Sequence, residues 1–181
     1  MFNKIDLNSI QAVEIEASTY CNAGCPYCAR HDHGTSKTIK SLPLRHIPIE
    51  VFNQLREDLD FISLNKSKEV ELWFVGNLGD AIMHPKLPYI WEYCAKNFKT
   101  IELETNGGVR PLKFWKEAGR VSKEESYDPY DPATMVFAID GLKDTNHLYR
   151  KGVDWDRLIS NAEAYINAGG NAEWKYLVFE H

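Results

Sequence analysis

The segment AVEIEASTYCNAGCPYC, residues 12–28, joins an alternating apolar stretch to three closely spaced cysteines. Residues 12–18 alternate apolar and polar side chains with a period of two, which predicts a strand with one buried face. Cys21, Cys25 and Cys28 follow directly, with the spacing C-x3-C-x2-C. Three thiolates on one short loop suit three corners of a [4Fe-4S] cluster and leave one iron open to a ligand from outside the protein.

Beyond this segment, two apolar patterns take turns along the chain. Stretches of strand character, most of them followed by glycine, recur at 69–76, 100–108, 134–141 and 172–180. Between the strands, apolar residues at helical spacing predict helices at 48–63, 86–98, 111–119 and 154–170. Strands that alternate with helices predict βαβ units, in which a parallel sheet carries its helices on the outer side.

Glycine and proline mark several of the expected boundaries. Gly119 and Gly169 are predicted to end the third and fourth helices, and Asp154 to cap the start of the fourth. Residues 120–133 contain two Asp-Pro pairs and are predicted to form a surface loop. In a parallel sheet of this kind the reactive groups lie at the carboxyl ends of the strands, so the cysteines fall where chemistry is expected.

Length and composition limit the class of protein. The 181 residues suit one domain, residues 1–181, and the charge of −5 with both signs interspersed argues against a nucleic-acid-binding surface. No stretch approaches the roughly 18 apolar residues of a membrane span, and the first ten residues lack a signal-peptide core, so we expect a cytoplasmic protein. Clustered cysteines in such a chain favour metal binding or catalysis over disulfides.

The fourth cysteine and two histidines bear on what the cysteine loop binds. Cys94 lies on the apolar stripe of the second predicted helix and is expected to be a buried hydrophobic residue. The alternative to an iron-sulfur cluster is a structural zinc ion, with His31 or His33 completing a Cys3His set.

Several motifs together resemble the radical S-adenosylmethionine (radical SAM) superfamily. C-x3-C-x2-C follows the first strand, with the aromatic Tyr27 before the last cysteine. The segment GNLGDAIMHP, residues 76–85, is similar to the family's glycine-glycine-glutamate-proline segment, with Gly79 and Asp80 at the glycine-glutamate positions. The third strand ends in TNGG, and the fourth ends in AIDG where many members have Ser-Ile-Asp-Gly.

The resemblance implies a fold, two cofactors and a reaction. The fold is a partial, TIM-like parallel (β/α) barrel of about five to six βα units. The family's template has six strands and five are predicted here, so either the sixth strand is dispensable or the chain is a truncated form. The cofactors are a [4Fe-4S] cluster and S-adenosylmethionine, which is cleaved reductively to a 5′-deoxyadenosyl radical that abstracts hydrogen from a substrate. The implied partners are a small-molecule or peptide substrate and an electron donor such as flavodoxin or ferredoxin.

The same resemblance implies which residues bind the cofactors. Asp80 would accept hydrogen bonds from the methionine ammonium group, and charge assistance strengthens such bonds. Aspartate is one methylene shorter than the family's glutamate, so the backbone of Gly76 to Gly79 is expected to approach the cofactor closely.

Asn106 and Asp140, at the ends of the third and fourth strands, are candidates to contact the ribose or the carboxylate. They are equally suited to Asx turns, and Ala138 stands where many relatives have serine. Tyr27 is a candidate to shield the cluster or to offer its backbone to adenine, and it is equally suited to covering the loop.

Charged residues interleave with apolar ones along the predicted strands, and we expect them to face the barrel interior and line a polar substrate cavity. The substrate contacts expected from this pattern are Glu16 and Glu104, near the strand ends. Arg150, in HLYRKG after the fourth strand, is a further candidate to reach a carboxylate of substrate or cofactor, and the alternative is an exposed, solvated charge. The interleaved residues are Glu14, Glu16, Glu71, Glu102, Glu104 and Lys175.

Two other functions stay open at the level of sequence. A glycyl-radical activating enzyme needs only one cluster and acts on a protein partner. A non-catalytic zinc- or iron-sulfur-binding module would use the same cysteines without a reaction.

Overall fold

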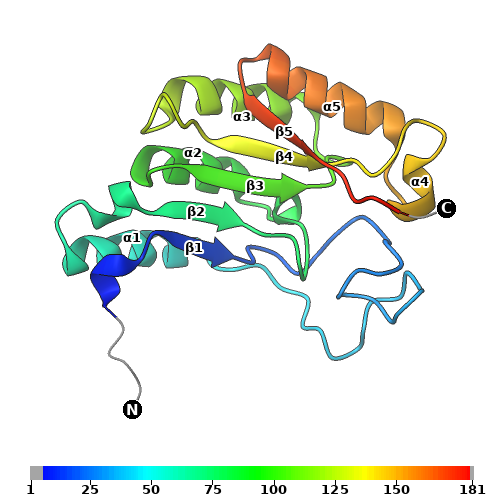
Figure 1. Ribbon diagram of the computed structural model, residues 1–181, viewed down its shortest axis with the longest axis horizontal. Coiled ribbons are helices and arrows are strands. Elements are labelled where there is room, and N and C mark those ends of the chain that lie inside the picture. Colours follow the sequence, from blue (N-terminus) through cyan, green and yellow to red (C-terminus); the bar gives the residue numbers. More distant parts are fainter. Residues whose placement is uncertain (1–5, 180–181) are drawn as a thin grey trace.

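Five parallel strands form one sheet in the computed structural model, which describes residues 6–179 (Figure 1). The spatial order is β1-β2-β3-β4-β5, and β1 does not pair with β5, so the sheet is open. This arrangement confirms the predicted partial parallel barrel. The strands are β1 (Ala12–Ile15), β2 (Glu71–Phe74), β3 (Ile101–Thr105), β4 (Thr134–Ala138) and β5 (Asn171–Lys175).

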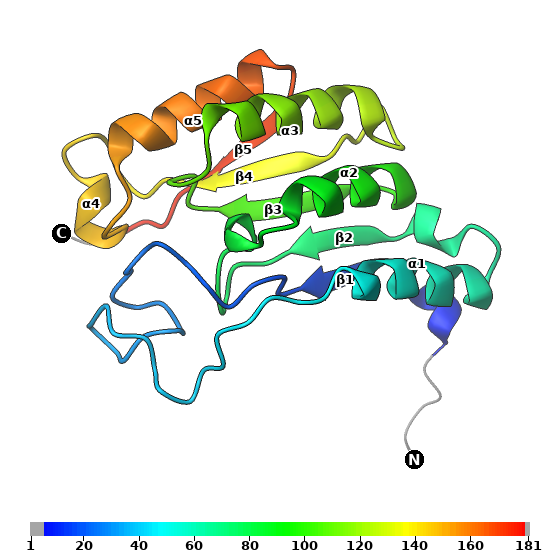
Figure 2. The ribbon, with the colours of Figure 1, turned by 180° about the vertical axis from the view of Figure 1, so that it is seen from behind.

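The longer helices cover a single face of the sheet, as Figure 2 shows from behind. They are α1 (Glu50–Ile62), α2 (Leu87–Asn97), α3 (Leu112–Glu125) and α5 (Trp155–Asn167). Within residues 6–179, no helix is both long and apolar enough to cross a membrane. The short elements are α4 (Asn146–Tyr149) and the 3-10 helices η1 (Leu7–Ser9), η2 (Lys66–Glu69) and η3 (Ala81–Met83).

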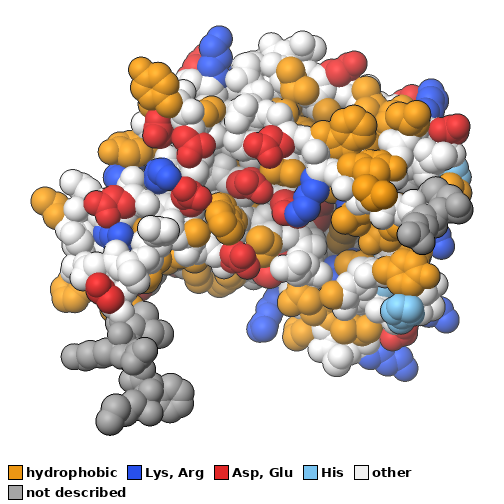
Figure 3. All heavy atoms as spheres, in the orientation of Figure 1, with side chains coloured by type: hydrophobic (Ala, Val, Ile, Leu, Met, Phe, Trp, Pro, Cys, Tyr) orange, Lys and Arg blue, Asp and Glu red, His pale blue; other side chains and the backbone are white. Residues whose placement is uncertain are grey.

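The alternation along the strands separates an apolar face from a charged one. In β3, Ile101 and Leu103 are fully buried, whereas Glu102 and Glu104 between them are partly exposed. Because successive side chains of a strand point to opposite faces, the glutamates lie on the face without helices. Figure 3 views that face and shows acidic side chains gathered over the strands. The sequence-based expectation of a charged interior face is therefore confirmed.

Large aromatic residues fill the space between the sheet and the helices. Trp91, Trp115 and Tyr165 are fully buried. The indole of Trp91 donates to the carbonyl of Ala118 at 3.0 Å, and the hydroxyl of Tyr165 donates to the carbonyl of Ala133 at 3.2 Å. These bonds remove the penalty of burying an unpaired polar atom, so the rings contribute their full apolar area to the core.

Helix α3 is longer than the sequence predicted. Gly119 does not end it, because the helix continues to Glu125 and only the rest of 120–133 is irregular. The glycine instead allows close approach of α5: a Cβ at Gly119 would lie 2.2 Å from the carbonyl oxygen of Tyr165. Val121 and Ser122 are buried beyond it and continue the apolar side of the helix.

The last strand is shorter than the sequence predicted. β5 ends at Lys175 rather than near residue 180, which lies outside the described residues. After Lys175 the chain leaves the ladder, and the backbone N–H of Leu177 donates to a carboxylate oxygen of Asp140 at 2.8 Å. A side chain at the end of β4 therefore replaces the ladder partner that the predicted strand would have used.

The contact between α3 and α5 gives a stability prediction. Gly119→Ala should lower the free energy of unfolding by about 1–3 kcal/mol, the usual range for overpacking, although alanine is the better helix former. Urea denaturation measures the change. Lys116→Ala on the exposed side of α3 is the control and should change stability by less than about 0.5 kcal/mol. A Gly119→Ala protein as stable as the wild type would contradict the close packing.

Candidate functional site

The three cysteines line one cavity at the carboxyl ends of the strands. The irregular segment between β1 and α1 lies at this end of the sheet (Figure 1). The cavity, which we call the cysteine cavity, has a volume of about 280 Å³. Its walls include the three thiols, the loop after β2 and the ends of β3 and β4. The lining residues used below are Cys21, Cys25, Cys28, Gly76, Gly79, Asp80, Glu104, Asn106, Tyr149, Arg150 and Lys175.

Backbone hydrogen bonds fix the cysteine loop to its neighbours. Gly24 donates its N–H to the carbonyl of Lys151 at 2.8 Å, and the hydroxyl of Ser36 donates to the carbonyl of Gly24 at 2.5 Å. The ring Nδ1 of His31 lies 2.8 Å from the carbonyl oxygen of Cys25. The loop is thus held from both the α4 side and the segment that follows it.

Burial disfavours the thiolate form of two of the three cysteines. It raises the pKa of Cys21 to about 12, and the nearby Asp80 carboxylate adds to the rise. Burial also raises the pKa of Cys25, while the Arg150 guanidinium opposes the change. Because thiolates are the metal-binding form, binding of iron at these residues must release protons.

Asp80 lies at the centre of a hydrogen-bond network between β2 and β3. Its Oδ2 accepts from the hydroxyl of Thr105 at 3.1 Å and from the backbone and side-chain nitrogens of Asn106 at 3.0 and 2.7 Å. Its Oδ1 accepts from the N–H of Ile82 at 3.0 Å. Burial raises the pKa of Asp80, and these hydrogen bonds oppose the rise. The network holds the loop after β2 against the end of β3.

Asn106 extends this network to the cysteine loop. Its Nδ2 also donates to Oδ1 of Asn22 at 3.0 Å and lies 3.6 Å from the sulfur of Cys21. Its Oδ1 accepts from the N–H of Gly108 at 3.0 Å. The side chain therefore forms the Asx-type turn that the sequence allowed and also contacts a predicted cluster ligand, while its contact with the ribose or carboxylate stays a prediction.

The glycines of the loop after β2 have different neighbours. A Cβ at Gly79 would lie 1.8 Å from the carbonyl oxygen of Ser18, so this glycine permits close contact between two protein backbones. At Gly76 the nearest atom to a Cβ is the carbonyl oxygen of Gly79, at 3.4 Å. Both residues line the cysteine cavity, and Gly79 is required by the packing of the chain itself.

Arg150 and Asp140 form a buried ion pair beside the cysteines. The Nε of Arg150 donates to Oδ2 of Asp140, whose side chain is 0% exposed, and its Nη1 lies 3.8 Å from the sulfur of Cys25. The sequence offered Arg150 as a candidate to reach a carboxylate of substrate or cofactor, and this stays a prediction. The structure places Arg150 in the wall of the cysteine cavity, where it contacts Asp140 and Cys25, and the sequence carries no local signal for these contacts.

A model of the Radical SAM superfamily matches residues 15–178, nearly the whole chain. The chain belongs to the radical SAM superfamily. Members of this superfamily use a [4Fe-4S] cluster and S-adenosylmethionine. No curated protein matches the sequence.

Two solved structures share the fold. HydG, a maturase of the [FeFe]-hydrogenase, superposes with a TM-score of 0.59 at 13% sequence identity, covering 92% of this chain and 34% of HydG. Methylornithine synthase (PylB) superposes with a TM-score of 0.55 at 11% identity, covering 91% of this chain and 44% of that protein. The chain thus spans well under two thirds of either structure, and the likeness shows the shared fold.

The side chains that line the cysteine cavity are of the chemical types that bind the two radical SAM cofactors. Three thiols open into one cavity, and thiolates are the usual ligands of iron-sulfur clusters. Oδ1 of Asp80 accepts one hydrogen bond from the protein, and a carboxylate oxygen can accept two. It can therefore accept a second hydrogen bond from an ammonium group. Within residues 6–179, no group of three or more His, Cys, Asp or Glu side chains is arranged to hold a single metal ion.

The histidines of the zinc alternative make other contacts. Besides the Cys25 carbonyl near its Nδ1, His31 has its Nε2 3.5 Å from Nη1 of Arg30. The His33 ring packs edge-on against Tyr27, with ring centroids 4.9 Å apart. Neither arrangement places an imidazole among the three sulfurs as a fourth ligand.

The predicted substrate residues Glu16 and Glu104 differ in their surroundings. Oε1 of Glu16 accepts from the N–H groups of Asn77 and Leu78 at 2.9 and 3.1 Å, so this carboxylate fastens the loop after β2 to the end of β1. Glu104 pairs with Lys175 across the face without helices, and both line the cysteine cavity. Glu104 thus lines the cavity, whereas Glu16 holds the loop that forms part of its wall, and a substrate contact stays a prediction for both.

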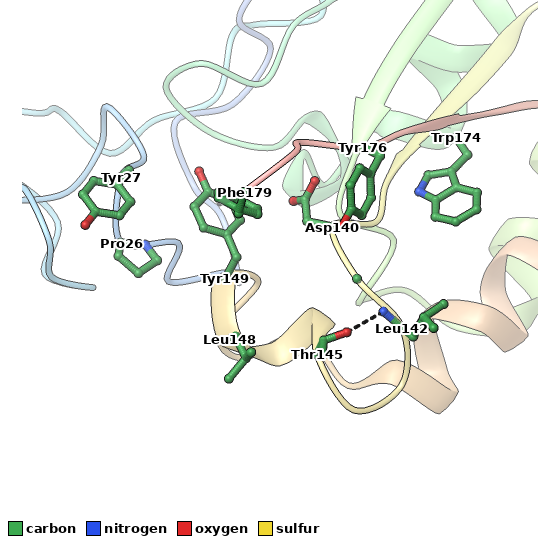
Figure 4. A pocket seen from close by; sticks show the side chains of 11 residues that line it. Pro26, Tyr27, Asp140, Leu142, Thr145, Leu148, Tyr149, Trp174, Tyr176 and Phe179 are labelled. Carbon is green, nitrogen blue, oxygen red and sulfur yellow. Dashed lines mark hydrogen bonds between the residues drawn. The ribbon is translucent and has the colours of Figure 1, made fainter. Parts of the chain in front are cut away.

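A second, larger cavity adjoins the first, and no local pattern in the sequence predicts it. This aromatic cavity has a volume of about 840 Å³ (Figure 4). Tyr149 lines both cavities, and Tyr27, 64% exposed, stands at the edge formed by the cysteine loop. The walls come from the cysteine loop, α4 and the end of the described chain, which are far apart in sequence. Its lining residues include Tyr27, Leu148, Tyr149, Trp174, Tyr176 and Phe179.

The Asp80 network gives a second stability prediction. Asp80→Ala should lower the free energy of unfolding by more than about 2 kcal/mol, because each buried donor left without an acceptor costs about 1–3 kcal/mol. Asp80→Asn keeps an acceptor oxygen and should lose less. Urea denaturation compares both with Asp131→Ala, an exposed aspartate that should change little. Equal stability of Asp80→Ala and the wild type would show that the network does not hold the two strand ends.

Proposed function

We propose that this chain binds a [4Fe-4S] cluster through Cys21, Cys25 and Cys28 and cleaves S-adenosylmethionine reductively to start a radical reaction on a separate substrate. The observation that supports this most is the convergence of the three thiols and the Asp80–Asn106 network on one cavity at the carboxyl edge of a parallel sheet. When bound, the cluster supplies one electron to the sulfonium cofactor, which yields a 5′-deoxyadenosyl radical that takes hydrogen from the substrate.

The chain's own residues position and shield the cofactors in this proposal. Oδ1 of Asp80 accepts a hydrogen bond from the methionine ammonium group, and Asn106 faces the ribose or carboxylate. The backbone at Gly76 and Gly79 forms the wall beside them, and Asp140 orients Arg150. Tyr27 covers the outer edge of the cysteine loop and limits the access of water.

The substrate in this proposal is a polar small molecule or peptide held in front of the face without helices. Glu104 and Lys175 both line the cysteine cavity from that face. Burial raises the pKa of the neighbouring Glu102, and repulsion from Glu173 and Glu104 adds to the rise. A surface with this much charge suits a polar substrate. The electron comes from a partner such as flavodoxin or ferredoxin, and we propose a cytoplasmic location.

Turnover of S-adenosylmethionine tests the proposal. After anaerobic reconstitution with iron and sulfide, dithionite and S-adenosylmethionine should yield 5′-deoxyadenosine, measured by chromatography. Cys25→Ala should lose more than about 99% of the product, because removing one ligand removes the site at which the cofactor is reduced. Cys94→Ser is the matched control: this thiol is fully buried in α2, away from the cavity, and its loss should leave the cluster and the product.

Two results would contradict the proposal. One is well-folded protein with a full cluster that forms no 5′-deoxyadenosine. The other is protein that retains one tightly bound zinc after aerobic purification and takes up no iron, which would support a non-catalytic binding module. If 5′-deoxyadenosine forms only when a large partner protein is present and a glycyl radical appears on that partner, the result would instead support a glycyl-radical activating enzyme.

A further inference from the structure

The three cysteine sulfurs receive different hydrogen-bond donors. The sulfur of Cys21 is 3.4 Å from the N–H of Ala23 and 3.6 Å from Nδ2 of Asn106, and both donors are neutral. The sulfur of Cys25 is 3.8 Å from a guanidinium nitrogen of Arg150. Among residues 6–179, no group donates a hydrogen bond to the sulfur of Cys28. Among the described residues, a guanidinium therefore lies within hydrogen-bonding distance of the Cys25 sulfur alone, although the charge of Arg30 also acts on Cys21 from farther away.

Arg150 is held in this position from several sides. Its side chain is 18% exposed and is paired with the fully buried carboxylate of Asp140. Its guanidinium carbon lies 5.4 Å from the centroid of the Tyr149 ring, and its backbone N–H donates to the carbonyl of Asn146 at 2.8 Å. Asp140 is held in turn by the N–H of Leu177. A guanidinium fixed in this way keeps its charge near the cysteine at any accessible pH.

We propose that Arg150 is a positioning residue that raises the reduction potential of the cluster by holding a positive charge against the Cys25 thiolate. The inference rests on the cluster-binding part of the proposed function. Reduction adds one electron, taken from an external donor, and so increases the negative charge of the cluster by one. A nearby cation stabilises the reduced form more than the oxidised form, and hydrogen bonds to cluster sulfurs are known to set such potentials.

The test is a redox titration of the reconstituted cluster without S-adenosylmethionine. Dithionite is the reductant, and the reduced cluster is followed by electron paramagnetic resonance. At a fixed potential, Arg150→Gln should lower the ratio of reduced to oxidised cluster at least tenfold, which is about 59 mV for a one-electron couple. Arg150→Lys keeps the charge and should stay within about threefold of the wild type. Arg157→Gln, the same change at an exposed arginine on α5, should leave the ratio unchanged.

Removing Arg150 alone leaves the buried Asp140 carboxylate without its cation, which can prevent folding. The double variant Asp140→Asn, Arg150→Gln removes both charges and should shift the ratio in the same direction by a smaller factor, because the charge nearer the sulfur dominates. The inference is overturned if the ratio of reduced to oxidised cluster in Arg150→Gln stays within twofold of the wild-type ratio. If Arg150→Gln does not fold, the same result in the double variant overturns it. A shifted potential in protein that forms no 5′-deoxyadenosine would leave this inference standing and overturn the proposed reaction.

Discussion

Carboxylates that follow one strand accept hydrogen bonds from the end of the next strand, and the cavity depends on these links. Glu16, after β1, accepts from the backbone of the loop after β2. Asp80, in that loop, accepts from the end of β3. Asp140, after β4, accepts from Leu177 after β5. Parallel strands have no hairpins to join their ends, so these side chains supply the connection.

Each of these links opposes the cost of burying a carboxylate with several donors. Burial raises the pKa of both Glu16 and Asp80, while backbone N–H groups oppose the rise. Asp140 has the additional positive charge of Arg150. The buried carboxylates of Asp80 and Asp140 have donors on both oxygens and resist movement, because displacing them would strand both the charge and the donors. The half-buried Glu16 is held through Oε1 only, since its Oε2 has no partner among the described residues. The cysteine loop is therefore packed against a wall that cannot easily rearrange.

The two cavities and the charged face follow from this wall. The cysteine cavity lies between the loops that the carboxylates hold, and the aromatic cavity lies beyond the Asp140–Arg150 pair, with Tyr149 as the shared boundary. The face without helices continues from the cysteine cavity along β3 and β5. Glu104 and Lys175 on that face line the same cavity as the three cysteines.

The sequence by itself determined the strand and helix order, the charged alternation and the position of the three cysteines, because each of these depends on a local repeat or spacing. It did not determine the end of α3, since Gly119 serves a contact with Tyr165 on another helix. It also did not determine that Glu16 fastens a loop, that Arg150 faces Cys25, or that α4 and the end of the chain enclose an aromatic cavity. Those features join segments far apart in the chain, and only the packing of the whole sheet brings their atoms within bonding distance.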